Sequence, residues 1–441
     1  MTNKIKITHL NKTRNMLYTI LRGVFGMIAI LGIALLMSNN RKAINYRLVA
    51  SGLLLQLLLA LFILKTAIGK AVFGTVGHII ESLLAFSREG GKFAFGFLAD
   101  KVELSRVLGH PADNFAFGIL IPTIIFVSVL VSIAYQIGLM QRIVAVMAKG
   151  MHFIMGVSGA EALSNVASAF VGQVEAQIMI KPYLSSMTKS ELLASMTGSM
   201  ACIAGGVMAI YISFGVPAEY LLAASLMAAP GALVIAKIVF PETEESVTKG
   251  KVSIKVEKPH ANLIDSIAHG CSDGLKISLN VIAMLVGFLA LIALINGLLK
   301  LLGGFLFEHH WFISGTMEFT RTLSLESLLG ILFSGFAWII GVSTDEMTTA
   351  GSLLGTKFVA NEFVAYSEFV KIMGGLSPKT VAILSFALCG FANLGSIGIQ
   401  IGGIGELAPD RRKELSQLGF KALLCGTLAS YLSATIAGML M

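Results

Sequence analysis

Charged residues are scarce in this sequence. Asp, Glu, Lys and Arg make up only 13% of the 441 residues, whereas apolar residues make up 55%. The mean hydropathy is +0.82, and both values lie well outside the composition of an ordinary soluble domain. The composition therefore predicts an integral membrane protein that crosses the lipid bilayer several times.

Cysteine is also sparse, and its distribution excludes two kinds of site. The four cysteines have no paired spacing and mostly lie in apolar surroundings: Cys202, Cys271, Cys389 and Cys425. Neither a disulfide framework nor a zinc site is predicted. A cleavable signal peptide is not predicted either, because the basic start from Lys4 to Arg14 precedes an apolar run without a small-residue cleavage site.

The sequence lacks a clustered basic face, although its formal net charge is +8. The basic residues are scattered through short segments between apolar runs, as the loop charges of membrane proteins are. Nucleic-acid binding is therefore not predicted. Positive charge is dense on both sides of the first apolar run, so the positive-inside rule gives no orientation.

Motifs of enzymes and ATPases are missing as well. No Gly-x-x-x-x-Gly-Lys-Ser/Thr loop occurs, so an ATP-driven pump is not predicted. No His-Glu-x-x-His motif, Gly-x-Ser-x-Gly motif or cluster of metal ligands occurs either. We therefore predict no enzyme activity, no catalytic residue and no organic cofactor, with a membrane enzyme that uses paired glutamates as a remote alternative.

Apolar runs of spanning length recur along the chain, and about eight full spans fit if each needs roughly 20 residues. The predicted spans are residues 23–38, 48–64, 117–140, 192–216, 221–240, 277–302, 380–404 and 418–441. Residues 66–114 and 141–156 mix apolar and charged positions, a pattern typical of helices at the membrane interface. Residues 328–373 are interrupted repeatedly by Gly, Ser, Thr and charge, which favours a re-entrant hairpin.

Two glutamates, Glu175 and Glu362, stand in apolar segments. A carboxylate near the centre of a bilayer costs about 2.5 to 3.5 kcal/mol, so we expect each of them to line a polar cavity and not to face lipid. We predict that the two segments form the two halves of one substrate site and that both acids share its aqueous chamber.

The two acidic segments are followed by similar sequences, which indicates an internal repeat. Each acid leads to a short polar segment and then to an interrupted apolar helix. The interruption is Gly205-Gly206 after Glu175, and Gly390 with Asn393 after Glu362; Gly206 and Asn393 each lie 31 residues beyond their acid. Helix breaks at corresponding places in two halves predict a transporter site, because a break frees backbone groups for a polar substrate. A close packing contact between helices is the alternative explanation for Gly-Gly.

Three motifs resemble the concentrative nucleoside transporter family. The segment Gly355-x-Lys357-x-x-x-Asn361-Glu362-Phe363-Val364-Ala365-Tyr366 matches the family signature. Gly172-Gln173-Val174-Glu175-Ala176 is similar to the family's Gly-Gln-Thr-Glu-Ala, and residues 390–398 are similar to its Phe-Ala-Asn-Phe-x-Ser-Ile-Gly. The likeness runs from about Gly118 to the C-terminus.

The resemblance implies an all-α membrane fold in the bacterial inner membrane. Expected features are eight membrane helices, two re-entrant helical hairpins, interfacial helices, an inverted repeat, a homotrimer and an elevator-type movement. The implied division is a basic N-terminal segment (1–22), scaffold helices with an interfacial helix (23–140), a first transport repeat with hairpin 1 (141–240), a polar linker with an interfacial helix (241–276), a scaffold helix (277–302) and a second transport repeat with hairpin 2 (328–441).

The resemblance also implies that the protein binds a nucleoside. The implied substrate contacts are Gln173, Val174, Glu175, Val207, Glu362, Phe391, Asn393 and Ser396. The first hairpin would face the nucleobase, whose donors and acceptors an amide can both match. Glu362, Asn393 and Ser396 would face the ribose, whose hydroxyl groups donate strong hydrogen bonds to a carboxylate.

Three charged residues near the signature are expected to have structural positions. Lys357 should contact a carboxylate or a helix end, and Asp345 and Glu346 should cap the hairpin tip or face water. A symporter of another polar solute, such as an amino acid or a dicarboxylate, remains an alternative. Two glutamates in the site argue against a substrate that carries its own carboxylate.

The coupling ion is predicted to be H⁺ or Na⁺. By resemblance to sodium-coupled members, the sodium ligands would be Ser168, Cys202 and the carbonyl groups of Val171 and Ile203. A hard cation prefers oxygen, and the thiol of Cys202 is a poor substitute. A carboxylate in a cavity of low dielectric binds protons more readily than one in water, so the sequence slightly favours H⁺.

Overall fold

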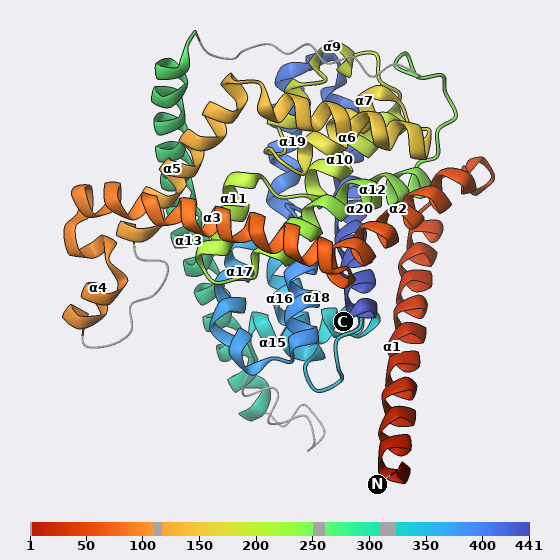
Figure 1. Cartoon of the computed structure of the whole chain (residues 1–441), viewed down its shortest axis with the longest axis horizontal. Helices are drawn as coiled ribbons and strands as arrows, with labels where there is room; N and C mark the ends of the chain where they lie inside the picture. The colour runs from red at the N-terminus through yellow and green to blue at the C-terminus, as the bar shows by residue number, and fades with distance from the viewer. Residues whose placement is uncertain (1, 109–116, 250–260, 309–322) are drawn as a thin grey trace.

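The computed structural model describes residues 2–108, 117–249, 261–308 and 323–441, and all regular secondary structure in these residues is helical (Figure 1). By length and composition, eight helical stretches among them could cross a membrane. Seven of the eight overlap the predicted spans. A helical fold is expected in lipid because a helix satisfies its backbone polar groups internally.

Six long helices form most of the spanning set. They are α1 (Thr2–Leu36), α2 (Tyr46–Lys65), α5 (Phe117–Gln136), α12 (Ala218–Val239), α13 (Leu263–Glu308) and α20 (Arg412–Leu440). α1 and α13 run roughly parallel to each other on opposite sides of the molecule (Figure 1). α13 begins at Leu263, well before the predicted start at residue 277, so the second half of the predicted linker is part of this helix.

Three helices occupy the segments predicted to lie at the membrane interface. They are α3 (Ala67–Phe95), α4 (Lys101–Leu108) and α6 (Leu139–Met155). α3 and α6 run across the direction of α1 and α13 (Figure 1), as interfacial helices would. Residues 67–108 are nevertheless the one stretch of the eight that was not predicted to span, and their mean hydropathy, 1.3, is the lowest of the eight. The rest of the predicted segment, residues 109–114, lies outside the described residues.

The structure contains the two predicted helix breaks. Residues 202–204 separate α10 (Lys189–Ala201) from α11 (Gly205–Ser213), so the first break precedes Gly205-Gly206, which begins α11. Residues 389–393 separate α18 (Pro378–Leu388) from α19 (Leu394–Leu407). The predicted spans 192–216 and 380–404 are therefore two helices each.

A helical hairpin precedes each broken helix. The first consists of α7 (Gly159–Ser168), α8 (Glu175–Ile178) and α9 (Lys181–Leu184), and the second of α16 (Met347–Val359) and α17 (Glu362–Ile372). Residues 328–373, predicted as one hairpin, include most of α15 (Leu325–Ile339) in addition to α16 and α17. α15 packs along α16. In both halves the hairpin with its acid comes first and the helix break follows.

The core of the molecule surrounds α12 and α20. These two helices are buried over 89% and 83% of their most apolar windows, and they pack against α1, α2, α10 and α18. α13 instead packs on α5, and none of its most apolar window is buried within the chain. α13 therefore lies at the edge of the bundle, held mainly by α5, which itself packs against α11 of the first broken helix.

The start of the polar linker is tied to the first hairpin. Lys237, near the end of α12, places its Nζ 2.8 Å from Glu161 of α7 and 3.2 Å from Glu242 of the linker. The backbone carbonyl and hydroxyl oxygen of Thr248 accept hydrogen bonds from the first two backbone N–H groups of α7, at 3.1 and 3.2 Å. Lys237, Glu161, Glu242 and Thr248 form what we call the linker clasp. The later linker residues 250–260 lie outside the described residues.

Candidate functional site

The tip of the second hairpin presents Glu362. Asn361 caps α17, and its Oδ1 accepts a hydrogen bond from Val364 N at 2.9 Å. Glu362 is consequently the first residue of that helix, where the helix dipole favours negative charge. Its side chain is almost enclosed, at 6% exposure, and accepts hydrogen bonds from Asn393 Nδ2 at 3.1 Å and Tyr211 Oη at 3.3 Å.

Asn393 links the second hairpin to the second break. It caps α19, and its Oδ1 accepts from Ser396 N at 2.9 Å. Its Nδ2 donates to Glu362 at the same time. Both ends of the amide are therefore engaged, and the first turn of α19 is held against the hairpin tip.

The tip of the first hairpin reaches the same turn of α19. Gln173 is 9% exposed, and its Nε2 donates to Ser396 Oγ at 3.4 Å. Its Oε1 is buried and accepts no hydrogen bond. A buried acceptor without a donor costs about 1 to 3 kcal/mol, so a ligand that donates a hydrogen bond here would remove this penalty. Gln173, Ser396, Asn393 and Glu362 thus form one connected polar group.

The structure encloses only one of the two acids, and the shared aqueous chamber stays a prediction. Glu362 is buried, but Glu175 is exposed. The carboxylate of Glu175 folds back toward Gly172, since a Cβ built there would lie 2.0 Å from Glu175 Oε2. The adjacent residue Val174 packs against Gly403 of α19.

Val174, Val207 and Phe391 occupy different parts of this region. Val174 contacts α19, where a Cβ on Gly403 would lie 2.4 Å from its Cγ2. Val207 is partly exposed on the first turn of α11. The backbone N–H of Phe391 donates to Cys202 O at 3.1 Å, so this residue joins the two helix breaks.

Tyr211 belongs to the site and was not predicted. It is fully buried, and its ring centroid lies 4.3 Å from that of Tyr366, whose hydroxyl group donates to Ser385 O at 2.7 Å. Its own hydroxyl group donates to Glu362. The available signal was position, because Tyr211 lies one helical turn after Val207 and faces the same side.

Lys357 contacts a helix end, as predicted. It is 1% exposed, and its Nζ donates to Ala387 O at 2.8 Å, in the last turn of α18. That turn has carbonyl groups without helical partners because α18 breaks at Cys389. A cation is favourable at a helix C-terminus, so Lys357 stabilises the second break without entering the polar group.

Glu346 lies at the base of the second hairpin, away from the polar group. Its carboxylate accepts from Ser377 N at 2.7 Å and from Ser377 Oγ at 2.8 Å, and so ties α16 to the start of α18. Partial burial raises the pKa of Glu346, but hydrogen bonds from Thr380, Ser377 and Ser343 outweigh this effect and hold the pKa below its ordinary value.

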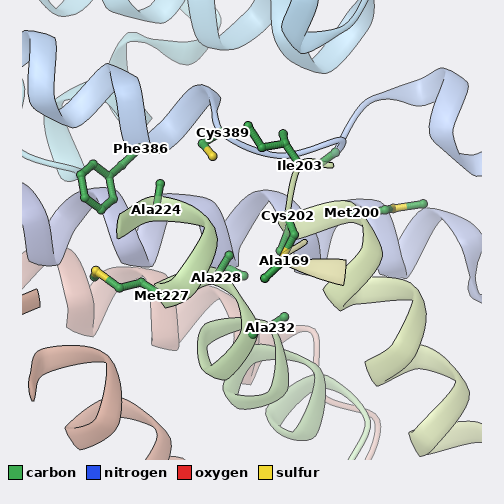
Figure 2. Close-up of a cluster of buried hydrophobic side chains, with 14 of the residues drawn as sticks. Ala169, Met200, Cys202, Ile203, Ala224, Met227, Ala228, Ala232, Phe386 and Cys389 are labelled. Atoms are coloured by element: carbon green, nitrogen blue, oxygen red, sulfur yellow. The ribbon is translucent and has the colours of Figure 1, made fainter. Parts of the chain in front are cut away.

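The residues proposed as sodium ligands lie where the first hairpin meets the first break. Gly205 N donates to Phe170 O at 3.0 Å, which joins the segment after α7 to the start of α11. Figure 2 shows Cys202 and Ile203 of this break together with Ala169 and with Cys389 of the second break.

The oxygen atoms at this junction give a partial fit to a sodium ion. Among the described residues, the buried carbonyl groups of Val171 and Ile203 accept no backbone hydrogen bond. Ser168 Oγ donates to a carbonyl of its own helix at 2.8 Å. Cys202 contributes sulfur, and its Sγ lies 3.9 Å from Ser225 O. Two free carbonyl oxygens and one hydroxyl group are suitable ligands, whereas the thiol is not.

Family models match three consecutive parts of the chain. Residues 25–98 match the N-terminal part and residues 220–438 the C-terminal part of a model described as Na⁺ dependent nucleoside transporter. Residues 117–218 match a model described as nucleoside recognition. Together these models cover both hairpins and both breaks.

Individual proteins and a solved structure agree with these matches. The nucleoside permease NupC of Helicobacter pylori is 39% identical, over 96% of this chain and 98% of its own length. The sodium/nucleoside cotransporter 1 of Rattus norvegicus is 36% identical, over 91% of this chain and 61% of its own length. The structure of CNTnw in an inward-facing substrate-bound state covers 96% of this chain and 98% of that one, with 42% identity and a TM-score of 0.87. This chain therefore belongs to the concentrative nucleoside transporter family.

Proposed function

We propose that the protein is a symporter that imports nucleosides across the bacterial inner membrane, driven by a cation gradient. The observation that carries the proposal is the polar group formed by Gln173, Ser396, Asn393 and Glu362, which joins both hairpin tips to the second break. A carrier needs such a group, buried in the membrane and formed by elements of both repeats, to hold a polar solute.

Glu362 is the proposed ribose contact. A carboxylate has two oxygen atoms with about four acceptor positions, and the protein supplies Glu362 with two side-chain donors, Asn393 and Tyr211. The remaining positions suit ribose hydroxyl groups, whose hydrogen bonds to a charged acceptor are stronger than neutral ones. Ser396 and Asn393 lie on the same turn and complete this part of the site.

Gln173 is the proposed nucleobase contact. Its unpaired Oε1 is suited to an N–H group of a base, and its Nε2 is suited to a ring nitrogen or carbonyl oxygen. The weak 3.4 Å bond to Ser396 is a small loss if the amide turns toward a ligand. Val207 and Phe391 would contact the substrate as apolar neighbours, and Glu175 would reach it only after the hairpin tip moves.

Sodium is the proposed coupling ion. The slight preference for H⁺ drawn from Ser168 and Cys202 has no support in the comparisons, whereas the matched family models are described as Na⁺ dependent. The free carbonyl oxygens of Val171 and Ile203 support an ion site beside the first break. Uptake at constant pH with and without a sodium gradient tests this choice; uptake that ignores sodium but stops with a protonophore would reverse it.

A homotrimer with elevator-type movement is the proposed assembly. The support is the apolar face of α13, whose most apolar window has no buried residue within one chain. α5 and α13 pack on each other beside the bundle that holds the site, as a fixed scaffold beside a moving part would. Cross-linking in membranes tests the trimer, and a monomer at all protein concentrations would contradict it.

The decisive experiment is uptake of radiolabelled uridine into proteoliposomes under a sodium gradient. We expect saturable uptake of intact uridine that other nucleosides inhibit and that amino acids and dicarboxylates do not. Inhibition by amino acids instead would identify a symporter of that solute. Chemical conversion of uridine during uptake would indicate an enzyme.

A further inference from the structure

A cavity lies outside the polar group described above. Its volume is about 540 Å³. Polar and charged side chains from α3, α4, α11 and the turn between α3 and α4 line much of it: Arg88, Lys92, Asp100, Ser105 and Ser213. Ile119 of α5 completes one wall. None of the proposed nucleoside contacts lines this cavity.

The cavity carries a positive charge that the protein does not neutralise. Lys92 Nζ lies 3.1 Å from Asp100 Oδ2, so these two side chains form an ion pair. Arg88 is exposed and makes no hydrogen bond or ion pair among the described residues. One guanidinium group is therefore free to bind an anion, and its planar set of donors fits the oxygen atoms of a phosphate group.

The helices beside the cavity also expose large apolar side chains. Phe86 and Phe93 of α3 are 64% and 95% exposed, and Val102 of α4 is 70% exposed. α3 runs across the direction of the long helices (Figure 1), the orientation expected of a helix at the membrane interface. A free cation beside apolar side chains at that level matches a phospholipid, which has a phosphate group next to acyl chains.

We propose that this cavity binds the phosphate headgroup of an anionic phospholipid, with Arg88 as the main donor and the acyl chains against the apolar face of α3 and α4. Arg88 lies on the same helix as Ser87, whose Oγ is 3.2 Å from Thr123 Oγ1 of α5. Ser213 ends α11, the second half of the first broken helix. A lipid in the cavity therefore contacts both the interfacial helices and a helix that leads to the nucleoside site.

Lipid binding can be measured without transport. The purified protein in detergent is mixed with phosphatidylglycerol or phosphatidylcholine, and the bound lipid is measured by intact-complex mass spectrometry. The variants are Arg88→Gln and Lys70→Gln, since Lys70 is an exposed cation on the same helix that does not line the cavity. A basic residue near the membrane surface contributes about 1 kcal/mol to anionic lipid binding, so Arg88→Gln should bind phosphatidylglycerol about fivefold more weakly.

The expected result is tight binding of phosphatidylglycerol by the wild type and by Lys70→Gln, with weak binding of phosphatidylcholine by all three proteins. Equal loss in both variants would indicate general charge attraction and overturn the proposal, as would unchanged binding by Arg88→Gln. Displacement of the lipid by excess inorganic phosphate would identify a site for a free anion instead. Wild-type binding of phosphatidylglycerol should also fall with added salt; insensitivity to salt would exclude Arg88 as the donor even if the variant does not fold.

Discussion

Replacing Glu362 with Gln tests the ribose contact most directly. The substitution keeps the size of the side chain but replaces two charged oxygen atoms with one neutral acceptor and one N–H₂ group. Asn393 Nδ2 can still donate to the remaining oxygen, and Tyr211 Oη can accept from the new N–H₂ group, so both protein contacts survive with altered polarity. The substitution should therefore weaken substrate binding without destabilising the fold.

The expected size of this loss follows from the hydrogen bonds involved. A hydrogen bond to a charged group contributes about 1.5 to 3 kcal/mol, compared with about 0.5 to 1.5 kcal/mol for a neutral one. Weakening one or two ribose bonds therefore costs about 1 to 3 kcal/mol, which corresponds to a KM for uridine about 5 to 150 times higher.

The assay is the initial rate of uridine uptake into proteoliposomes over a range of uridine concentrations. Glu368→Gln is the matched control, because Glu368 lies on the same helix, is only partly buried and is outside the polar group. We expect the control to retain the wild-type KM. A KM within twofold of wild type for Glu362→Gln, or an equal rise for Glu368→Gln, would refute the assignment of Glu362 to the ribose.

Further predictions concern the linker clasp, the sodium ligands and the base of the second hairpin. Lys237→Met should destabilise the protein by about 3 to 5 kcal/mol, because Glu161 would remain buried without a partner; thermal unfolding measures this, and adding Glu161→Met should restore most of the loss. Cys202→Ser should lower the sodium concentration for half-maximal uptake at constant pH, since it supplies an oxygen ligand; an unchanged value would remove Cys202 from the site. The folded protein lowers the pKa of Glu346 below the ordinary value of 4.5, so the extra stability of wild type over Glu346→Gln should be complete above that pH and disappear as the pH falls through the lowered value. Thermal unfolding of both proteins from neutral to acidic pH checks this, and a difference that grows in acid would contradict it.

Local sequence patterns were sufficient to predict the helix breaks and the residues beside them. Asn361 and Asn393 each precede a helix as its cap, and glycine interrupts the apolar run near Asn393, so each signal lies within a few residues of the feature. The type of partner of Lys357, a carboxylate or a helix end, could be predicted because a buried cation needs an acceptor.

Contacts between distant parts of the chain could not be predicted in this way. Tyr211 and Glu362 are separated by 151 residues, and no local pattern connects them. Val174 packs against Gly403, which lies in the other repeat. The linker clasp depends on a charge at the end of α12 meeting an acid of α7. Each of these contacts joins residues that are far apart in the sequence, so the spacing of residues along the chain does not predict it.

The linker clasp holds the base of the first hairpin more firmly than the tip is held. At one end, buried ion pairs and backbone hydrogen bonds anchor α7 to α12 and the linker. At the other end, Gln173 is held to α19 by a single 3.4 Å hydrogen bond. Val174 also packs on Gly403, and Phe170 O accepts a hydrogen bond from Gly205 N, but among the described residues no ion pair anchors this end. We therefore expect the tip to separate from α19 more readily than α7 separates from α12, so the residence time of a bound solute should depend on Gln173 and the stability of the hairpin base on Lys237.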